Sequence, residues 1–187
     1  MLVVFSVDSS SLSISYLGPN GTYSYSALRE AFPLAIAVPF SSIAEVVDSV
    51  FNSSVNLGVI PLANSRTGEI KDTRKALDRY NVKIITEIKL PIVHCLGALS
   101  NHLGIRTIIS KDNVLEQCEE YLNKNYPNAE RIFISSSAAA AREVYENDLI
   151  YCAAIASKES IRENSLEIIA RDLVPGNYSI FVVIARE

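Results

Sequence analysis

The stretch LGPNGTYSYSAL, residues 17–28, joins an apolar strand-like run to an amphipathic helix. Gly18, Pro19 and Gly21 lie in the joining loop, and Thr22 stands where the helix begins. Threonine is a favoured N-cap residue, and glycine lets the backbone approach a ligand closely. Because the first turn of a helix offers unpaired N–H groups, the stretch predicts either an anion-binding loop or an ordinary capped turn.

Strand-like and helical patterns alternate along nearly the whole chain, which predicts the α/β class. Ser42 followed by Glu45 predicts a capping box at the start of one helix. The residues expected on two further helix faces are Tyr25, Leu28, Ala31 and Phe32, and Val114, Leu115, Cys118, Tyr121 and Leu122. The expected strands are residues 12–17, 56–62, 82–88, 91–99, 105–110, 131–134, 149–155, 166–172 and 178–185.

No linker rich in glycine or proline divides the chain, and the pattern suggests two lobes joined by two crossings. The strand-like runs 82–88 and 90–98 meet at Lys89-Leu90-Pro91, which predicts a direct passage between lobes. Leu166–Asp172 is expected to carry the chain back. The predicted first lobe is residues 1–89 with 167–187, and the predicted second lobe is residues 90–166.

The composition excludes several classes of protein. With 187 residues, 49% of them hydrophobic, the chain is able to bury a core, and its net charge of −4 argues against a nucleic-acid or anionic-membrane partner. Residues 1–10, MLVVFSVDSS, lack the positive charge of a signal peptide, and their apolar run is too short to span a membrane. These features predict a soluble, cytoplasmic protein.

The cysteines and histidines predict neither disulfides nor a metal site. Cys95, Cys118 and Cys152 are odd in number and lie in apolar surroundings, which is typical of buried reduced thiols. His94 and His102 are the only histidines, and no Cys or His pair has the spacing of metal ligands. His94 is expected to be a hydrogen-bonded core residue.

Small polar residues follow several expected strands. Asn64 and Ser65 follow residues 56–62, and Ser136 and Ser137 follow residues 131–134. In open α/β sheets ligands bind beyond the carboxyl ends of strands, which makes these residues candidates for a binding site. Asn64 and Ser65 also fit an ordinary Asx or Ser turn, and one of the two serines is expected to cap the helix that follows.

Several of these stretches, in order, resemble the prephenate dehydratase family. The motifs that carry the resemblance are GPNGTYS (18–24), IPLANSRTGEIKDT (60–73), PIVHCL (91–96), SKDNVLEQCEEYL (110–122), SSSAAAA (135–141) and NYSIFVVI (177–184). The resemblance implies two α/β lobes around a cleft, like a type II periplasmic binding protein. It implies conversion of prephenate to phenylpyruvate with loss of water and CO₂, no cofactor, and assembly as a homodimer.

Prephenate carries two carboxylates and a ring hydroxyl, which suit helix N-termini, amides and hydroxyls. As CO₂ departs, the leaving hydroxyl gains negative charge, and a positioned hydroxyl donor stabilises it. The catalytic residues that the resemblance implies are Ser179, Asn64 and Ser65. The implied substrate-binding residues are Thr22, Tyr23, Gly68, Thr73, Ser136, Ser137, Ala138 and Phe181. Thr73 equally fits a surface helix residue, and Phe181 either shields the cleft or fills the core.

Two positions depart from the family pattern. Ala63 stands where the family usually has glutamate, and Ser179-Ile180-Phe181 stands where it usually has Thr-Arg-Phe. Ile180→Arg has three expected outcomes. It should lower KM if position 180 contacts the substrate, weaken substrate binding if another cation has already replaced the arginine, and destabilise the fold if strand alternation turns it toward the core. The cations that remain as candidates are Arg66, Lys71 and Arg142.

The motifs end close to residue 187, so the resemblance covers a catalytic domain without the family's phenylalanine-binding ACT domain, and we expect no feedback control within the chain. Two alternatives to prephenate dehydration stay open. One is a non-catalytic module that binds small carboxylic acids, and the other is dehydration of arogenate, the aminated form of prephenate.

Overall fold

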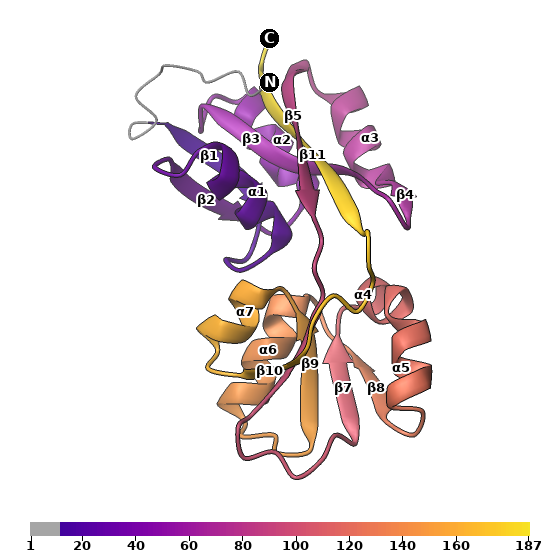
Figure 1. Cartoon of the computed structure of the whole chain (residues 1–187). Coiled ribbons are helices and arrows are strands. Elements are labelled where there is room, and N and C mark those ends of the chain that lie inside the picture. Colours follow the sequence, from indigo (N-terminus) through magenta and orange to yellow (C-terminus); the bar gives the residue numbers. More distant parts are fainter. Residues whose placement is uncertain (1–11) are drawn as a thin grey trace. The chain divides into compact units, whose positions relative to one another are not determined.

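The computed structural model describes residues 12–187, which form two compact α/β units (Figure 1). The first unit runs to Leu90 and resumes with Tyr178–Glu187, and the second unit is Pro91–Asn177. Residues 1–11, and with them the apolar run noted in the sequence, lie outside the described residues. The chain passes from the first unit to the second and returns to the first.

The return passage comes later in the chain than the sequence predicts. Residues 167–187 are expected in the first lobe, but β10 (Glu167–Ala170) pairs antiparallel with β6 (Cys95–Ala98) in the second unit. Residues 167–177 therefore belong to the second unit. The strand-like pattern of this segment identifies a strand correctly, but it contains no information about which sheet the strand joins.

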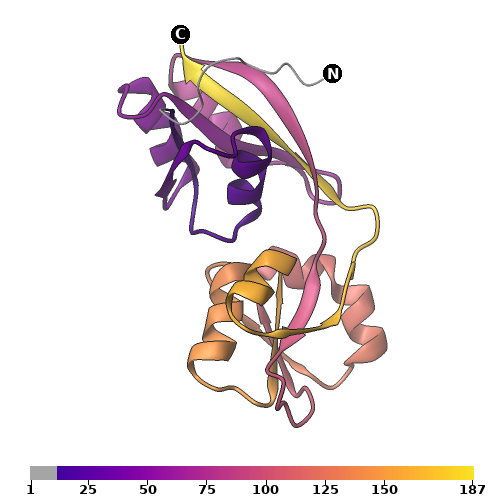
Figure 2. The ribbon, with the colours of Figure 1, turned by 60° about the vertical axis from the view of Figure 1, so that its left-hand side comes forward.

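The first unit contains a six-stranded sheet in which β1 lies between β2 and β3, and β11 lies between β3 and β5. β1 runs parallel to β2 and β3, whereas β11 is antiparallel to β3. Figures 1 and 2 both show β5 alongside β11. The strands are β1 Ser13–Leu17, β2 Ile36–Phe40, β3 Leu57–Asn64, β4 Gly68–Glu69, β5 Val82–Pro91 and β11 Tyr178–Arg186, and the helices are α1 Tyr23–Ala31, α2 Ile43–Phe51 and α3 Lys71–Arg79.

One apolar cluster joins this sheet to α2 and α3. Val46 and Val50 of α2 pack with Ile60 of β3 and with Val182 and Ile184 of β11. Since successive side chains of a strand point to opposite faces, the even-numbered residues of β11 face α2 and α3. This assignment of faces places Ile180 on the side of α2 and α3 and Ser179 on the opposite side of the sheet.

The second unit contains a five-stranded sheet in the order β10-β6-β9-β7-β8. Its two faces carry separate apolar clusters, because adjacent strand residues such as Ile108 and Ile109 belong to different clusters. The remaining strands are β7 Thr107–Ser110, β8 Glu130–Phe133 and β9 Cys152–Ala156, and the helices are α4 Asp112–Gln117, α5 Glu119–Asn125, α6 Ser137–Glu146 and α7 Lys158–Glu163.

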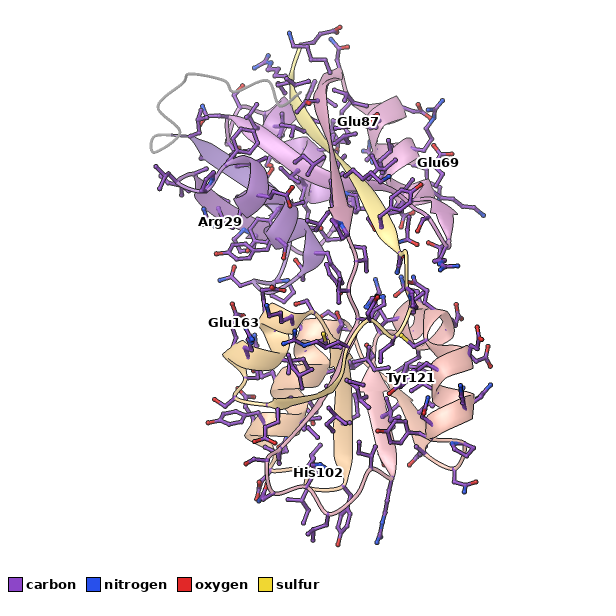
Figure 3. All side chains as sticks on the ribbon, viewed as in Figure 1. Arg29, Glu69, Glu87, His102, Tyr121 and Glu163 are labelled. Carbon is purple, nitrogen blue, oxygen red and sulfur yellow. The ribbon has the colours of Figure 1, made fainter. Side chains whose placement is uncertain are left out.

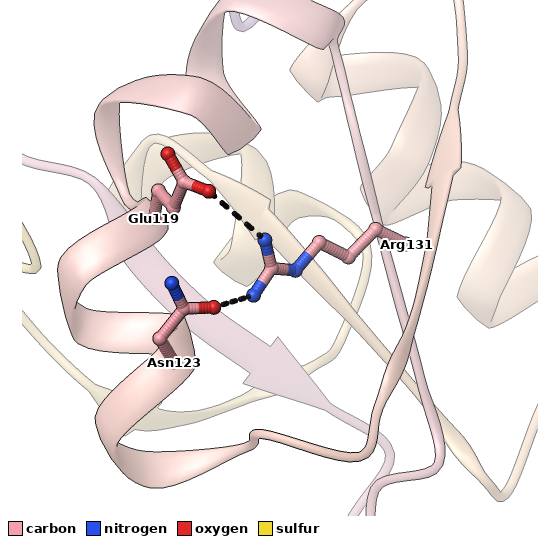
Figure 4. Close-up of polar contacts among 3 residues, drawn as sticks. All are labelled: Glu119, Asn123 and Arg131. Atoms are coloured by element: carbon pink, nitrogen blue, oxygen red, sulfur yellow. Dashed lines mark hydrogen bonds and ion pairs between the residues drawn. The ribbon is translucent and has the colours of Figure 1, made fainter.

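Arg131 connects the edge strand β8 to α5 (Figure 4). Its guanidinium donates a hydrogen bond to Asn123 Oδ1, and its Nη1 lies 3.9 Å from Glu119 Oε1. Exposed ion pairs of this kind contribute less than about 1 kcal/mol to stability. The position of β8 therefore depends mainly on its parallel pairing with β7.

The predicted helix starts are confirmed where the sequence has a capping residue. Ser42 Oγ accepts from Glu45 N at 3.2 Å, and Glu45 Oε2 accepts from Ser42 N at 3.1 Å, which completes the capping box. Hydrogen bonds from Ser41, foremost that of its hydroxyl, and from Ser42 lower the pKa of the Glu45 carboxyl. Thr22 and Ser136 also cap their helices through their side chains.

Some elements differ from the prediction. The helix expected over residues 110–122 is divided at Cys118 into α4 and α5, although its predicted apolar face is buried except for the half-buried Tyr121. Strands β2 and β4 do not appear among the expected strands. β2 contains Pro39, and proline is unfavourable in strands away from a sheet edge, while β4 has two residues and no apolar pattern.

The cysteines are free thiols. Cys95 and Cys118 are buried, as the sequence predicts, whereas Cys152 is half-buried. Burial raises the pKa of the Cys118 thiol to about 12, so it stays protonated at neutral pH. Within residues 12–187, no group of three or more His, Cys, Asp or Glu side chains is placed to hold a metal ion. Over the same range, no helix is both long enough and apolar enough to cross a membrane.

Candidate active site

The central contact of the candidate site joins β3 to β11. Ser179 lies opposite Asn64 in the antiparallel pairing of these strands. Asn64 Nδ2 donates to Ser179 Oγ at 3.0 Å and to the Tyr178 carbonyl oxygen at 3.1 Å. The structure therefore brings together two of the three residues that the sequence assigned to catalysis.

The other end of the Asn64 amide is also held. Asn64 Oδ1 accepts from the backbone nitrogens of Arg66 at 2.8 Å and Thr67 at 3.3 Å. Reversing the amide would place its NH₂ group against two N–H donors, so the hydrogen-bond partners fix its orientation. Asn64 thus forms the Asx turn that the sequence also allowed, and the same side chain presents a donor to Ser179.

Ser65 connects the loop after β3 to the start of β11 through two hydrogen bonds. Ser65 N donates to the Tyr178 carbonyl at 2.9 Å, and Tyr178 N donates to Ser65 Oγ at 3.0 Å. Ser65 is exposed, and this reciprocal pair gives it a clear structural role. Its catalytic role stays a prediction.

A bulge in β3 sets the direction of Asn64. Ile180 is opposite Ala63 and Phe181 is opposite Pro61, so Leu62 is an extra residue in β3. With strict alternation from Ile60, which faces α2 and α3, Asn64 would face the same helices. The extra residue shifts the alternation by one, and Asn64 instead meets Ser179 on the opposite face.

The bond from Asn64 determines what the Ser179 hydroxyl is able to do. Because Ser179 Oγ accepts from Asn64 Nδ2, its own hydrogen points elsewhere and is available to a second acceptor. Ser179 is only 9% exposed, so an acceptor in contact with it would be largely removed from water. A hydrogen bond to developing negative charge is strongest in such a place.

Ile180 points away from this pair. Alternation along β11 places Ile180 on the face of Val182 and Ile184, toward α2 and α3, and opposite to Ser179. Ile180 is half-buried there. Of the three outcomes that the sequence left open for arginine at this position, the structure therefore favours destabilisation over a change in substrate binding.

We expect Ile180→Arg to leave KM within about twofold of wild type and to lower Tm by several degrees or more, since an unpaired guanidinium at this half-buried position costs at least the roughly 1–3 kcal/mol of a buried neutral polar group. Thermal melting measured beside steady-state kinetics checks both parts. Ile180→Leu, which keeps an apolar side chain of equal size, is the control. A KM lowered several-fold with an unchanged melt would show that position 180 contacts the substrate after all.

The loop of residues 17–22 is shaped by packing within the first unit. A Cβ atom on Gly18 would lie 2.8 Å from Pro39 Cβ, and Gly18 N donates to the Phe40 carbonyl at 2.9 Å. Gly21 has φ +80°, which favours glycine. Gly18 is thus required by the close approach of β2, in agreement with the alternative that the loop is an ordinary turn; its approach to a ligand stays a prediction.

Thr22 begins α1 as predicted. Its Oγ1 accepts from Tyr25 N at 3.3 Å and donates to the Leu17 carbonyl at 3.1 Å. The hydroxyl is therefore used within the unit, and what the start of α1 offers a ligand is its backbone N–H groups. Tyr23, the first residue of α1, is half-buried.

Arg29 of α1 (Figure 3) connects α1 to the segment that precedes β2, and no pattern in the sequence marks it. Its Nε donates to Tyr25 Oη at 3.1 Å, its guanidinium carbon lies 5.1 Å from the Tyr25 ring centre, and its Nη1 donates to the Ala35 carbonyl at 2.7 Å. The Tyr25 ring lies 5.4 Å from that of Tyr16. Burial, foremost, raises the pKa of the Tyr16 hydroxyl, which donates to Asn20.

Three further candidates have structural roles in the first unit. Thr73 is fully buried and donates to the Pro61 carbonyl, so the surface alternative for Thr73 is wrong. Phe181 is 2% exposed, in agreement with the alternative that it fills the core. Gly68 lies in β4, is exposed and has φ +79°. Binding of substrate by these residues stays a prediction.

The other candidates belong to the second unit. Ser136 is the N-cap of α6, where its Oγ accepts from Ala139 N at 3.0 Å. Ser137 is the first helical residue, and Ala138 is buried. Of the two serines, Ser136 is therefore the one that caps the helix, and the roles of all three in binding stay predictions.

His94 is a buried core residue, as predicted. It is 2% exposed, and its Nε2 lies 3.2 Å from Gln117 Oε1, which also accepts from Asn177 Nδ2 at 2.9 Å. Burial lowers the pKa of His94, although the bond to Gln117 and the charge of Asp172 oppose the change. His94 is therefore uncharged in the folded protein at neutral pH.

This burial predicts a loss of stability in acid. As pH falls below 6.5, the usual value, the unfolded chain binds a proton at His94 before the folded chain does, so the free energy of unfolding falls, by up to about 1.4 kcal/mol per pH unit. Denaturant unfolding between pH 7 and 5 should give a smaller decrease for His94→Gln than for wild type. His102→Gln is the matched control. If it reduces the decrease in the free energy of unfolding as much as His94→Gln does, the assignment of the effect to His94 is wrong.

Two α/β units joined by two crossings of the chain define the class of type II periplasmic-binding-protein-like folds. A putative methionine-binding lipoprotein from Bacillus subtilis shares this fold, with a TM-score of 0.53, 15% identity, and coverage of 94% of this chain and 83% of that one. The prephenate dehydratase family model matches residues 14–187. The chain belongs to the prephenate dehydratase family.

Individual relatives agree with this assignment. Arogenate dehydratase/prephenate dehydratase 2 of Arabidopsis thaliana is 33% identical over 93% of this chain and 46% of that protein. The bifunctional chorismate mutase/prephenate dehydratase of Stutzerimonas stutzeri is 37% identical over 71% of this chain and 37% of that protein. The chain thus spans less than half the length of these two relatives.

Among solved structures, prephenate dehydratase from Arthrobacter aurescens in complex with L-Phe has the same fold. The TM-score is 0.85 at 24% identity, over 94% of this chain and 60% of that one. The two-unit architecture that the sequence predicted is therefore confirmed.

Proposed function

We propose that this chain converts prephenate to phenylpyruvate, with release of water and CO₂, as a step of phenylalanine biosynthesis. The observation that carries the proposal is the 3.0 Å hydrogen bond from Asn64 Nδ2 to Ser179 Oγ, which directs the serine hydrogen toward another acceptor. Membership of the prephenate dehydratase family supports the substrate and the reaction.

The reaction requires little chemistry from the protein. The ring carboxylate leaves as CO₂, its bonding electrons enter the ring, and the C–O bond to the ring hydroxyl breaks, so the ring becomes aromatic. The departing hydroxide takes up one proton and becomes water. A positioned hydroxyl that hydrogen-bonds the leaving oxygen stabilises its growing negative charge, and we assign this role to Ser179. No step needs a cofactor.

We assign roles in anion binding to two helix starts, each within its own unit. In the first unit this is the start of α1 at Thr22 and Tyr23. In the second unit it is the start of α6 at Ser136, Ser137 and Ala138. Helix starts suit anions because their first N–H groups are unpaired and carry partial positive charge. Gly68 and Thr73 are assigned to shaping the loop and helix beside Asn64.

We also infer that the protein acts in a reducing compartment such as the cytoplasm, and as a homodimer. The three free cysteines, none of them in a disulfide, support the compartment. Some relatives are chloroplastic, so localisation of a tagged chain in its own cells is the direct test.

An assay decides between the candidate activities. The purified protein is mixed with prephenate or with arogenate, and the product is followed by its absorbance in alkali or by chromatography. Turnover of prephenate at the higher kcat/KM supports the proposal, and preference for arogenate would instead support an arogenate dehydratase. Calorimetric binding of prephenate without turnover would show a non-catalytic binding module.

A further inference from the structure

The strand β5 forms one edge of the six-stranded sheet in the first unit. In the described part of the chain, no strand pairs with its outer side. The opposite edge, β2, contains Pro39, which lacks an N–H group and so discourages pairing. The segment Lys83–Glu87 of β5 contains no proline, so each of its residues has a backbone N–H group and none blocks pairing with a further strand.

The side chains of β5 are apolar on both faces at its middle. Ile84 is 47% exposed and Ile85 is 36% exposed, and as neighbours in a strand they point to opposite faces. The flanking residues Lys83 and Glu87 are exposed and carry opposite charges. An edge lysine often prevents pairing, but here an acid lies four residues further along the same strand.

We propose that β5 pairs antiparallel with β5 of a second copy of this chain, about a two-fold axis at Ile85. In this arrangement Lys83 lies opposite Glu87 of the partner subunit, and symmetry repeats the pair on the other side of the axis. Ile85 lies opposite its own copy, and Ile84 lies opposite Thr86 of the partner subunit. Both charges and both isoleucines thereby gain cross-strand partners.

The charges select this register. Glu87 is the only acidic residue in β5, so Lys83 meets an acid only when the axis passes through Ile85. A slip by two residues sets Lys83 against either Ile85 or Lys89 of the partner subunit. Lys89 already has a neighbour within its own chain, because its Nζ lies 3.9 Å from the centre of the Tyr178 ring.

The inference rests on the homodimer proposed above and not on catalysis, so its failure and failure of the proposed activity are distinguishable. None of the residues at this edge belongs to the candidate active site. A monomer that turns over prephenate would refute the pairing alone, and a dimer without turnover would refute the activity alone.

Charge exchange tests the register. Sedimentation of the full chain from about 1 to 100 μM is expected to show dimers. Lys83→Glu and Glu87→Lys should each raise the dimer dissociation constant at least about tenfold, because each places two like-charged pairs across the axis. The double exchange should restore the dimer, and an equimolar mixture of the two single variants should form mixed dimers. Lys124→Glu, on an exposed position of α5, is the control.

Each variant is first checked for a wild-type circular dichroism spectrum and melt. A monomeric wild type, single variants that dimerise as well as wild type, or a double exchange that stays monomeric would each overturn the proposal. Hydrogen exchange gives a second measurement, since protection of residues 82–88 should rise with protein concentration. Protection independent of concentration would mean that another part of the same chain covers the edge, and the proposal would be wrong.

Discussion

Ser179→Ala is expected to lower kcat for prephenate dehydration by about 100-fold while KM changes by less than about threefold. The Ser179 hydroxyl accepts from Asn64 Nδ2, which leaves its hydrogen for the departing oxygen of the substrate. That oxygen gains charge only as its bond to the ring breaks, so the lost hydrogen bond matters mainly in the transition state. Initial rates of phenylpyruvate formation over a range of prephenate concentrations measure both parameters.

Two variants serve as controls for this result. Ser179→Thr keeps a hydroxyl at the residue type that the family usually has, and it should retain most of the activity. Ser54→Ala removes a hydroxyl from an exposed position of the first unit and should change neither parameter. A wild-type kcat in Ser179→Ala would remove the residue from the mechanism.

Asn64→Ala is expected to lower kcat/KM by about 1,000-fold, with both parameters affected, and to lower stability by about 1–2 kcal/mol. The hydrogen bonds of the side chain include two that form the turn at Arg66 and Thr67 and two that reach Tyr178 and Ser179. Its removal loosens the loop and frees the Ser179 hydroxyl to rotate. Denaturant unfolding and steady-state kinetics on the same preparation measure the two effects.

Asn64→Asp separates the turn from the catalytic contact. Aspartate keeps the oxygen that accepts from the turn but replaces the NH₂ donor with a second oxygen, toward which Ser179 would direct its own hydrogen. We expect the turn to be kept, some loss of stability because the second oxygen faces the Tyr178 carbonyl oxygen, and a kcat as low as that of Ser179→Ala. If Asn64→Asp keeps the wild-type kcat, Asn64 is a turn-forming residue and nothing more.

The sequence predicts the α/β class, most strands and several helix starts, because these follow from local patterns. The capping box at Ser42 and Glu45 needs only residues that are close in the chain. The missed strand β2 has one strongly exposed isoleucine, a proline and weak alternation, so nothing local distinguishes it from a loop. That omission explains why the sequence does not predict the packing role of Gly18, whose close neighbour Pro39 lies in β2.

In the candidate site, likewise, the sequence motifs identify residues but do not show which of them are in contact. Asn64 and Ser179 are both recognised from motifs, but they are 115 residues apart, and only the pairing of β3 with β11 brings them into contact. The hydrogen bonds of Ser65 and Thr73 depend equally on elements distant in the chain. A local signal for the bulge does exist, since Pro61 lies in β3, a strand flanked on both sides, where proline is expected mainly at bulges.

The extra residue in β3 makes the site depend on the length of the strand as well as on its side chains. Deleting Leu62 would make Pro61 and Ala63 neighbours, so β3 and β11 would pair without interruption and Asn64 would still lie opposite Ser179. Regular pairing with Leu62 kept would instead turn Asn64 toward α2 and α3. Every residue named in the mechanism would be present in both cases, so the number of residues between Ile60 and Asn64, together with the bulge, decides whether the site forms.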